Sequence, residues 1–325
     1  MGLEMRSSVH NRTEYLNWEW SPNWVTWFVA IETPVMLSTL VVLIKMLYKY
    51  LKTDASSLLH PHLFISMMMM GIFNMVFFIF DSLTFRLPTT GYLTAWCASL
   101  EPNRALVYIY IVQLLSTYWS MFFTLQFCII RLIIFVFPGN HKTYTKFVLP
   151  IYSLLAFFLP FISPYFMYTA KGYCRQWDNV FDFGAVFISY YDTYNGVRHD
   201  LFFTPVTVTV PVVITIVNGI FAYYAEKHAS NPHMKNKVFN GKTKCALFYT
   251  NLAMTIPYAA HCILTILTAF VVPSWSPYSI IIRTPLTDVA HLSVILFYYF
   301  SHQLFNGQHS ANAIQPASSI TPQIS

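Results

Sequence analysis

The sequence predicts an all-α membrane protein, a bundle of seven transmembrane helices with its N-terminus outside and its C-terminus inside. Three observations carry this prediction: seven long apolar stretches, a composition poor in charge, and basic residues gathered in alternate connections. Of the 325 residues, 56% are hydrophobic and only 10% are charged, whereas a soluble domain has about 25% charged residues. A soluble fold could not bury this much apolar surface.

The seven apolar stretches are separated by polar connections. A helix needs roughly 20 apolar residues to cross a bilayer, and lipid leaves backbone groups no partner outside their own helix. The seventh stretch is the weakest because Asp288 and His291 lie inside it, and we expect its helix to begin a turn earlier. The expected spans are residues 24–47, 63–80, 105–130, 147–168, 201–224, 246–272 and 285–300.

The spans divide the chain into three parts. Residues 1–23 form an extracellular N-terminal segment, residues 24–304 the seven-transmembrane domain, and residues 305–325 a cytoplasmic tail. The tail is rich in Ser, Ala, Pro and Gln, a composition typical of disorder. No cleavable signal peptide is expected, because charged residues precede the first apolar stretch and no short apolar region stands before it.

The orientation follows from the distribution of charge. With the N-terminus outside, eleven of the 19 basic residues fall in the inner connections, opposed only by Asp54 and Glu226, while nine acidic residues, Asp81 among them, fall outside. Basic residues concentrate on the cytoplasmic side of membrane proteins. The glycosylation sequon Asn11-Arg12-Thr13 falls in the outer N-terminal segment, where a glycan on Asn11 requires it.

Two of the five cysteines lie in the expected outer connections. Cys97 precedes the third span and Cys174 follows the fourth, in the compartment where disulfides persist. We expect a Cys97–Cys174 disulfide that pins the second outer loop over the third span. The alternative is a pair of free thiols exposed to oxidation.

Several motifs outside the spans resemble one receptor family. They are Val9-His10-Asn11, Glu14-Tyr15, the run from Trp96 to Asn103, Gly172-Tyr173-Cys174-Arg175-Gln176 and Phe183-Gly184-Ala185. With these motifs the chain resembles, over nearly its whole length, the nematode serpentine chemoreceptors of class U (Sru), within the class gamma (Srg) group. The resemblance implies a GPCR-like receptor of chemosensory neurons, in the plasma membrane of sensory cilia, with a small-molecule ligand and a heterotrimeric G protein as partners.

The chain departs from the rhodopsin-like receptors at their activation switches. Arg131, at the end of the third span, has no acidic residue before it. The seventh span lacks an Asn-Pro-x-x-Tyr motif, and Pro257 in the sixth lacks the usual preceding aromatic residue. The familiar switches therefore cannot be assigned residue by residue, and G-protein coupling is implied by the resemblance alone.

Polar residues inside the spans are the candidates for ligand binding, because intramembrane polar groups usually face the interior of a bundle. We expect Glu32, Asp288 and His291 to form one polar cluster between the first and seventh spans. Its role is either a structural hydrogen-bond network or direct ligand contact. The full set of candidates is Glu32, Gln113, Tyr118, His261, Asp288 and His291.

The inner connections are the candidate surface for a G protein, although the bias of basic residues toward the cytoplasm explains their charge as well. No enzyme motif, cofactor site, metal site or nucleic-acid partner is expected. The competing class is a seven-span ligand-gated channel or a transporter of inverted topology, which the charge distribution opposes. The G-protein-facing candidates are Arg131, Lys142, Lys146, Lys235 and Lys237.

Overall fold

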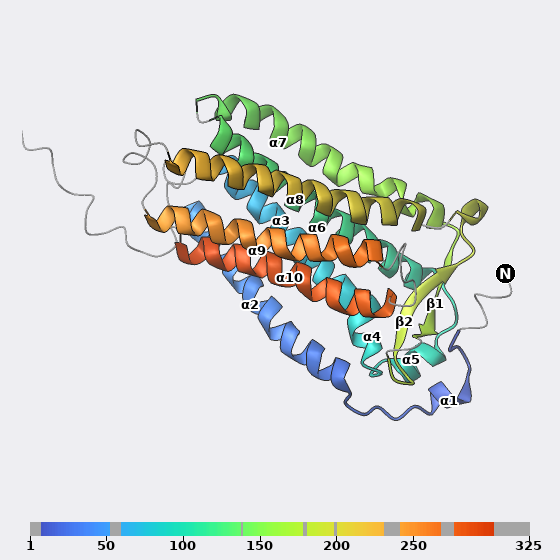
Figure 1. Ribbon diagram of the computed structural model, residues 1–325. Coiled ribbons are helices and arrows are strands. Elements are labelled where there is room, and N and C mark those ends of the chain that lie inside the picture. Colours follow the sequence, from blue (N-terminus) through green and yellow to red (C-terminus); the bar gives the residue numbers. More distant parts are fainter. Residues whose placement is uncertain are drawn as a thin grey trace, which may run out of the picture.

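A computed structural model describes residues 8–52, 60–137, 139–177, 181–197, 200–230, 241–267 and 276–301. Within these residues, each of the seven expected spans corresponds to one long helix, and the helices run side by side as a bundle (Figure 1). The helices are α2 Trp24–Lys52, α3 Pro61–Asp81, α6 Arg104–Val136, α7 His141–Phe158, α8 Asp200–Ser230, α9 Gly241–Ile266 and α10 Ser276–Ser301. The predicted all-α bundle of seven long helices is confirmed, and the orientation of its termini stays a prediction.

Five helical segments of the described chain are long and apolar enough to cross a membrane. They are Trp24–Lys52, Pro61–Thr89, Arg104–Val136, His141–Met167 and Leu201–Lys227, whereas Pro285–Phe300 is a shorter apolar segment. Helix α10 begins at Ser276, earlier than the single extra turn that the sequence suggested. The apolar run gives too short a length for α10 because the first turns of this helix contain polar residues.

The second span continues beyond the expected boundary. A π-helical turn, η3 Ser82–Arg86, follows α3 directly, and α4 Leu87–Thr89 follows that turn. Asp81, expected in an outer connection, is therefore inside a continuous helical segment and buried. This corrects the sequence prediction, and the reason is a pairing partner described below.

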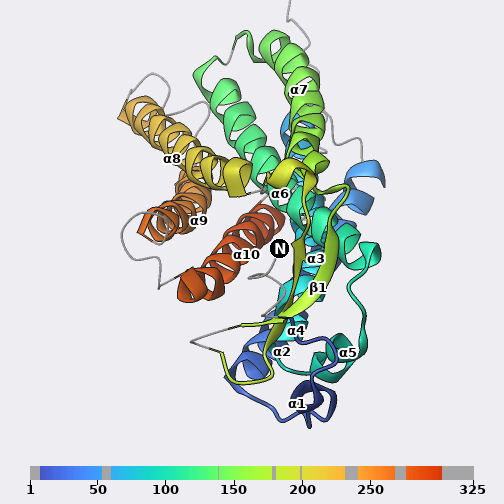
Figure 2. The ribbon, with the colours of Figure 1, turned by 90° about the vertical axis from the view of Figure 1, so that its right-hand side faces the viewer.

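Helix α6 lies at the centre of the bundle. It packs against α3, α7 and α8, while α9 lies between α8 and α10 (Figure 2). Side chains such as Met67, Phe123 and Phe127 fill the interior. By contrast, α2 and α7 expose large apolar side chains, Ile31 and Leu154 among them, as expected for surfaces that face lipid.

One end of the bundle carries a compact cap, and we call this end the hairpin end (Figure 1). The cap contains an antiparallel hairpin of two strands, in which Lys171 pairs with Tyr191 and Gln176 with Val186. A short helix from the N-terminal segment packs against another that precedes α6. The elements of the cap are α1 Thr13–Leu16, α5 Thr94–Ser99, β1 Lys171–Gln176, β2 Val186–Tyr191 and the 3₁₀ turn η6 Tyr194–Gly196.

Candidate functional site

A cavity of about 240 Å³ lies inside the bundle near the hairpin end. We call it the outer pocket. Helices α3, α6, α8, α9 and α10 contribute its walls, and the hairpin contributes its roof. Its apolar lining consists largely of aromatic rings, and its polar lining is Asp81, Thr84, Gln113, Thr117, Ser120, His261 and Thr287. A largely apolar cleft with a few polar groups is typical of a small-molecule site.

The hairpin supplies aromatic side chains to the roof. Trp177 and Phe187 both line the outer pocket, and their ring centroids are 4.2 Å apart. Trp177 also meets Phe85 of the second span edge-on at 5.2 Å. The roof is therefore packed onto the helices below it.

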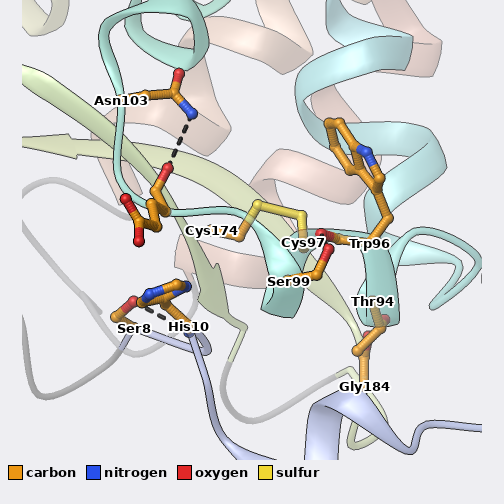
Figure 3. Close-up of a disulfide and its surroundings, with 10 residues drawn as sticks. Ser8, His10, Thr94, Trp96, Cys97, Ser99, Asn103, Cys174 and Gly184 are labelled. Atoms are coloured by element: carbon orange, nitrogen blue, oxygen red, sulfur yellow. Dashed lines mark hydrogen bonds between the residues drawn. A yellow bond between two sulfur atoms is a disulfide. The ribbon is translucent and has the colours of Figure 1, made fainter.

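A disulfide fixes this hairpin to the rest of the cap. Cys97 of α5 is bonded to Cys174 of β1, with Cα atoms 5.6 Å apart (Figure 3). Next to it, the backbones of Asn103 and Gly172 exchange hydrogen bonds of 3.0 and 2.9 Å, which joins β1 to the start of α6. The predicted disulfide is confirmed, and the second loop lies over the third span as expected.

The N-terminal segment is part of the cap. The Val9 N–H donates to the Cys174 carbonyl at 3.2 Å, and the Trp18 indole N–H donates to the Gly91 carbonyl at 3.1 Å. Trp18 also packs so closely on Gly184 that a Cβ atom there would lie 2.4 Å from the indole ring. Asn11 is exposed in this segment, so its glycosylation, still a prediction, is sterically possible.

Beside the outer pocket lies a buried group of charges that we call the carboxylate cluster: Glu32, Asp81 and Asp288 around Arg86. The guanidinium nitrogens of Arg86 lie 2.6 Å from Glu32 Oε2, 2.6 Å from Asp81 Oδ2 and 2.7 Å from Asp288 Oδ2. Each of the four side chains is at most 11% exposed. The cluster joins α2, α3 and α10 across a hydrocarbon environment, where an unpaired charge is costly.

The π-helical turn explains how Arg86 reaches its partners. A π-helix forms i to i+5 hydrogen bonds, and Arg86 stands five residues after Asp81, to which its Nε donates. The guanidinium also stacks 4.7 Å from the centroid of the Phe78 ring. The widened turn thus directs one cation toward α2 and α10 at once.

The structure brings together only part of the cluster that the sequence suggested. Glu32 and Asp288 meet through Arg86, which the sequence reasoning did not identify. His291 does not join them: its Nε2 lies 2.8 Å from Thr124 Oγ1 and 3.2 Å from the Tyr258 hydroxyl. His291 instead links α10 to α6 and α9, deeper in the bundle.

The other ligand-binding candidates also separate. Gln113 and His261 line the outer pocket, and Gln113 Nε2 lies 3.4 Å from Asp81 Oδ1. Tyr118 is buried outside the lining, where its hydroxyl donates to Ser163 Oγ at 3.1 Å. Thus Gln113 and His261 remain candidates for ligand contact, whereas the Tyr118 contacts are those of a packing residue.

Arg131 does not face the surface at the end opposite the hairpin, as a direct G-protein contact would require. Its side chain is buried and donates to Asn218 at 2.6 Å and to Asn251 at 2.9 Å. Both bonds come from one nitrogen, Nη2, while Nε and Nη1 are buried without a hydrogen-bond partner within the described residues. The burial of the side chain argues against the expectation that Arg131 faces a G protein directly. Lys142 and Lys146 are exposed at the start of α7, and Lys235 and Lys237 lie outside the described residues.

Three histidine rings meet at the end opposite the hairpin. The ring centroid of His60 lies 5.3 Å from that of His62 and 4.9 Å from that of His141. Burial, followed by the repulsion of His141, lowers the pKa of His60 to about 4, so His60 is neutral at pH 7. Among the described residues, no group of His, Cys, Asp and Glu has the arrangement of a metal site.

Comparison with known proteins completes the picture. The fold, the capped pocket and the disulfide define a seven-helix membrane protein of the receptor type. Residues 9–308 match the model of the family described as serpentine type 7TM GPCR chemoreceptor Sru, and the chain belongs to this family. It is therefore a multi-pass membrane protein of a chemoreceptor family, not of an enzyme family.

A curated relative agrees with this assignment. Serpentine receptor class U-26 of Caenorhabditis elegans is 32% identical over an alignment of 199 residues that covers 58% of this chain. The match covers 65% of the relative's own length, so the chain spans just under two thirds of it.

Proposed function

We propose that the protein is a chemosensory G-protein-coupled receptor that binds a small chemical cue in the outer pocket and signals through a heterotrimeric G protein. The observation that carries the proposal is the pocket beneath a disulfide-anchored hairpin. At about 240 Å³ the pocket is smaller than the roughly 300 to 1,000 Å³ of drug-sized ligand sites, so it suits a ligand of few atoms. Membership of the chemoreceptor family supports the same role.

In this proposal the hairpin end faces outward and the C-terminal tail inward, in the plasma membrane of sensory cilia. Two features support this orientation. The Cys97–Cys174 disulfide lies at the hairpin end, and disulfides persist in the extracellular compartment. The exposed Lys142 and Lys146 lie at the opposite end, as basic residues on the cytoplasmic side do.

The proposed G-protein surface is the end opposite the hairpin. Lys142 and Lys146 contribute positive charge there. Lys235 and Lys237 belong, by sequence, to another of the expected inner connections. Arg131 takes part indirectly, because it holds α8 and α9 together through Asn218 and Asn251. The Arg131 contacts must change if these two helices separate to admit a partner.

A pocket-filling variant tests the ligand site. The receptor is expressed with a heterotrimeric G protein and screened against small volatile and water-soluble compounds with a second-messenger readout. Thr117→Trp fills the outer pocket, so we expect it to abolish any response while the surface level is retained. Ile216→Trp, at a side chain that is 55% exposed on α8, is the matched control and should leave the response unchanged.

Equal responses from the two variants would place the ligand elsewhere. Antibody access to terminal tags separates the receptor from the competing class of inverted channels and transporters. An N-terminal tag reached in intact cells, with a C-terminal tag reached only after permeabilisation, supports the receptor. The reverse pattern would refute the proposed orientation and favour a channel.

A further inference from the structure

The carboxylate cluster carries more negative than positive charge. Three carboxylates contact a single guanidinium, so the ionised cluster has a net charge of −2. No second basic side chain of the described chain forms an ion pair with it. Among the described side chains, Arg175 is a further cation, 5.7 Å from the ring centroid of Phe187, which lines the outer pocket; with Arg175 included, these described charges still sum to −1.

The cluster also has unused hydrogen-bond acceptors. Asp288 Oδ1 and Glu32 Oε1 are buried and accept no hydrogen bond within the described residues, although the Asp288 side chain is only 3% exposed. Asp81 Oδ1 has only the long contact with Gln113. Buried carboxylate oxygens normally accept hydrogen bonds. Of the three carboxylates only Asp81 lines the outer pocket, so Asp81 is the group to which a ligand can supply a donor.

The negative charge of the cluster reaches the outer pocket through Asp81, the one member of the cluster among the residues that line it. The rings of Phe85, Trp177 and Tyr110 line the same cavity. Aromatic faces attract cations as well as apolar groups. A negative group beside several rings suits a ligand with a positive charge on a small apolar body.

We propose that the outer pocket binds a small protonated amine, whose ammonium group meets Asp81 and whose apolar part packs among the aromatic rings. The inference rests on the proposed function, because it names the ligand class for the same pocket. An ammonium group brings the charge and the hydrogen-bond donors that the carboxylate cluster lacks. A carboxylate ligand would add a further negative charge, and the pocket rejects it.

The sign of the potential in the pocket can be measured without knowing the ligand. Thr117→Cys introduces a thiol in the outer pocket of the full-length receptor. Intact cells are treated with a cationic or an anionic methanethiosulfonate of similar size, aminoethyl or sulfonatoethyl, and labelling at position 117 is counted by peptide mass. Tyr92→Cys, at a side chain that is 65% exposed at the same end, corrects for the intrinsic rates of the two reagents.

We expect the cationic reagent to label position 117 about tenfold faster than the anionic one, relative to position 92, because a cleft of one charge sign concentrates counter-ions. Glu32→Gln reduces the negative charge of the cluster by one without removing the Asp81–Arg86 bond, and it should reduce this preference. An equal rate, or a preference for the anionic reagent, would overturn the inference. It would do so even if the receptor responds to other ligands.

The second measurement compares an amine with an alcohol and an acid of similar shape as ligands of the purified receptor. Phenylethylamine should raise the melting temperature of the purified receptor more than 2-phenylethanol does, and phenylacetate should leave it unchanged. Stabilisation by the alcohol or the acid equal to that by the amine would also refute the inference. A cationic preference in a receptor that activates no G protein would leave the ligand class intact and refute the proposed function instead.

Discussion

At the scale of single residues, Arg86 organises the membrane-embedded part of the site. It pairs with carboxylates from three helices in a region where most side chains are apolar. Removing one partner of a buried ion pair is far more costly than removing a surface pair, since it leaves uncompensated charge. Arg86 therefore holds α2, α3 and α10 together through its ion pairs.

We expect Arg86→Met to lower the stability of the folded receptor by about 3 to 5 kcal/mol, because three carboxylates would then face one another without a cation. The melting temperature of the purified protein and the surface level measure the effect. Arg104→Met, at an exposed position at the start of α6, is the control and should change little. Adding Glu32→Gln should restore part of the loss, and a double variant no more stable than Arg86→Met alone would argue against electrostatic coupling.

The sequence indicated this site incompletely. Glu32 and Asp288 were recognisable because charged residues inside apolar stretches stand out. Arg86 was not, because it follows the apolar run of the second span by six residues and fits a connection equally well. Only the π-helical turn, which composition does not reveal, carries it back into the bundle. The available signal was that the first and seventh spans each contain an acidic residue, because carboxylates inside a membrane need a cation from another part of the chain.

At the scale of elements, the hairpin depends on close contact with α6. At Gly172, a Cβ atom would lie 2.5 Å from the Val107 backbone nitrogen and 2.6 Å from the Leu106 Cβ. The atoms that it meets belong to a buried helix, so they cannot move aside as a flexible side chain would. Only glycine allows the hairpin to pair with Asn103 at this distance.

Gly172→Ala should therefore displace the hairpin from α6 and destabilise the receptor by about 1 to 3 kcal/mol, the range for overpacking a filled site. Gly219→Ala on α8 meets nothing within 4 Å and should be neutral or stabilising by about 0.5 to 1 kcal/mol. Thermal unfolding of both variants, followed by tryptophan fluorescence, tests the contrast. Similar melting temperatures would show that the hairpin tolerates a shift.

The elements themselves were largely predictable, since apolar length specifies each span. The cap and the irregular turns were not predictable from the sequence. The hairpin and α5 are too short for periodicity to define, and their positions depend on the Cys97–Cys174 disulfide and on contacts with the N-terminal segment. His291 was misplaced for a related reason: its position on α10 was known, but which neighbouring helix it faces depends on the packing of α6 and α9.

At the scale of the whole molecule, the orientation in the membrane has a direct chemical test. Asn11 is exposed in the cap, so in the proposed orientation it enters the secretory lumen and accepts a glycan. We expect the wild-type receptor to gain gel mobility on treatment with peptide-N-glycosidase. Asn11→Gln and Thr13→Ala should each abolish the shift, because each removes one end of the sequon. A shift that persists in both variants would exclude Asn11 as the acceptor.

The residues that line the outer pocket belong to two kinds of structural element, the transmembrane helices and the hairpin of the cap. The floor and walls of the pocket are transmembrane residues, each of which must also satisfy the bilayer and the neighbouring helices. Its roof, Trp177 and Phe187, belongs to a hairpin held by a covalent bond and a few backbone contacts. If the pocket is the ligand site that we propose, exchange of roof side chains would change the preferred shape of the ligand, while the charged group below, shared among three helices, would keep the proposed preference for a cation.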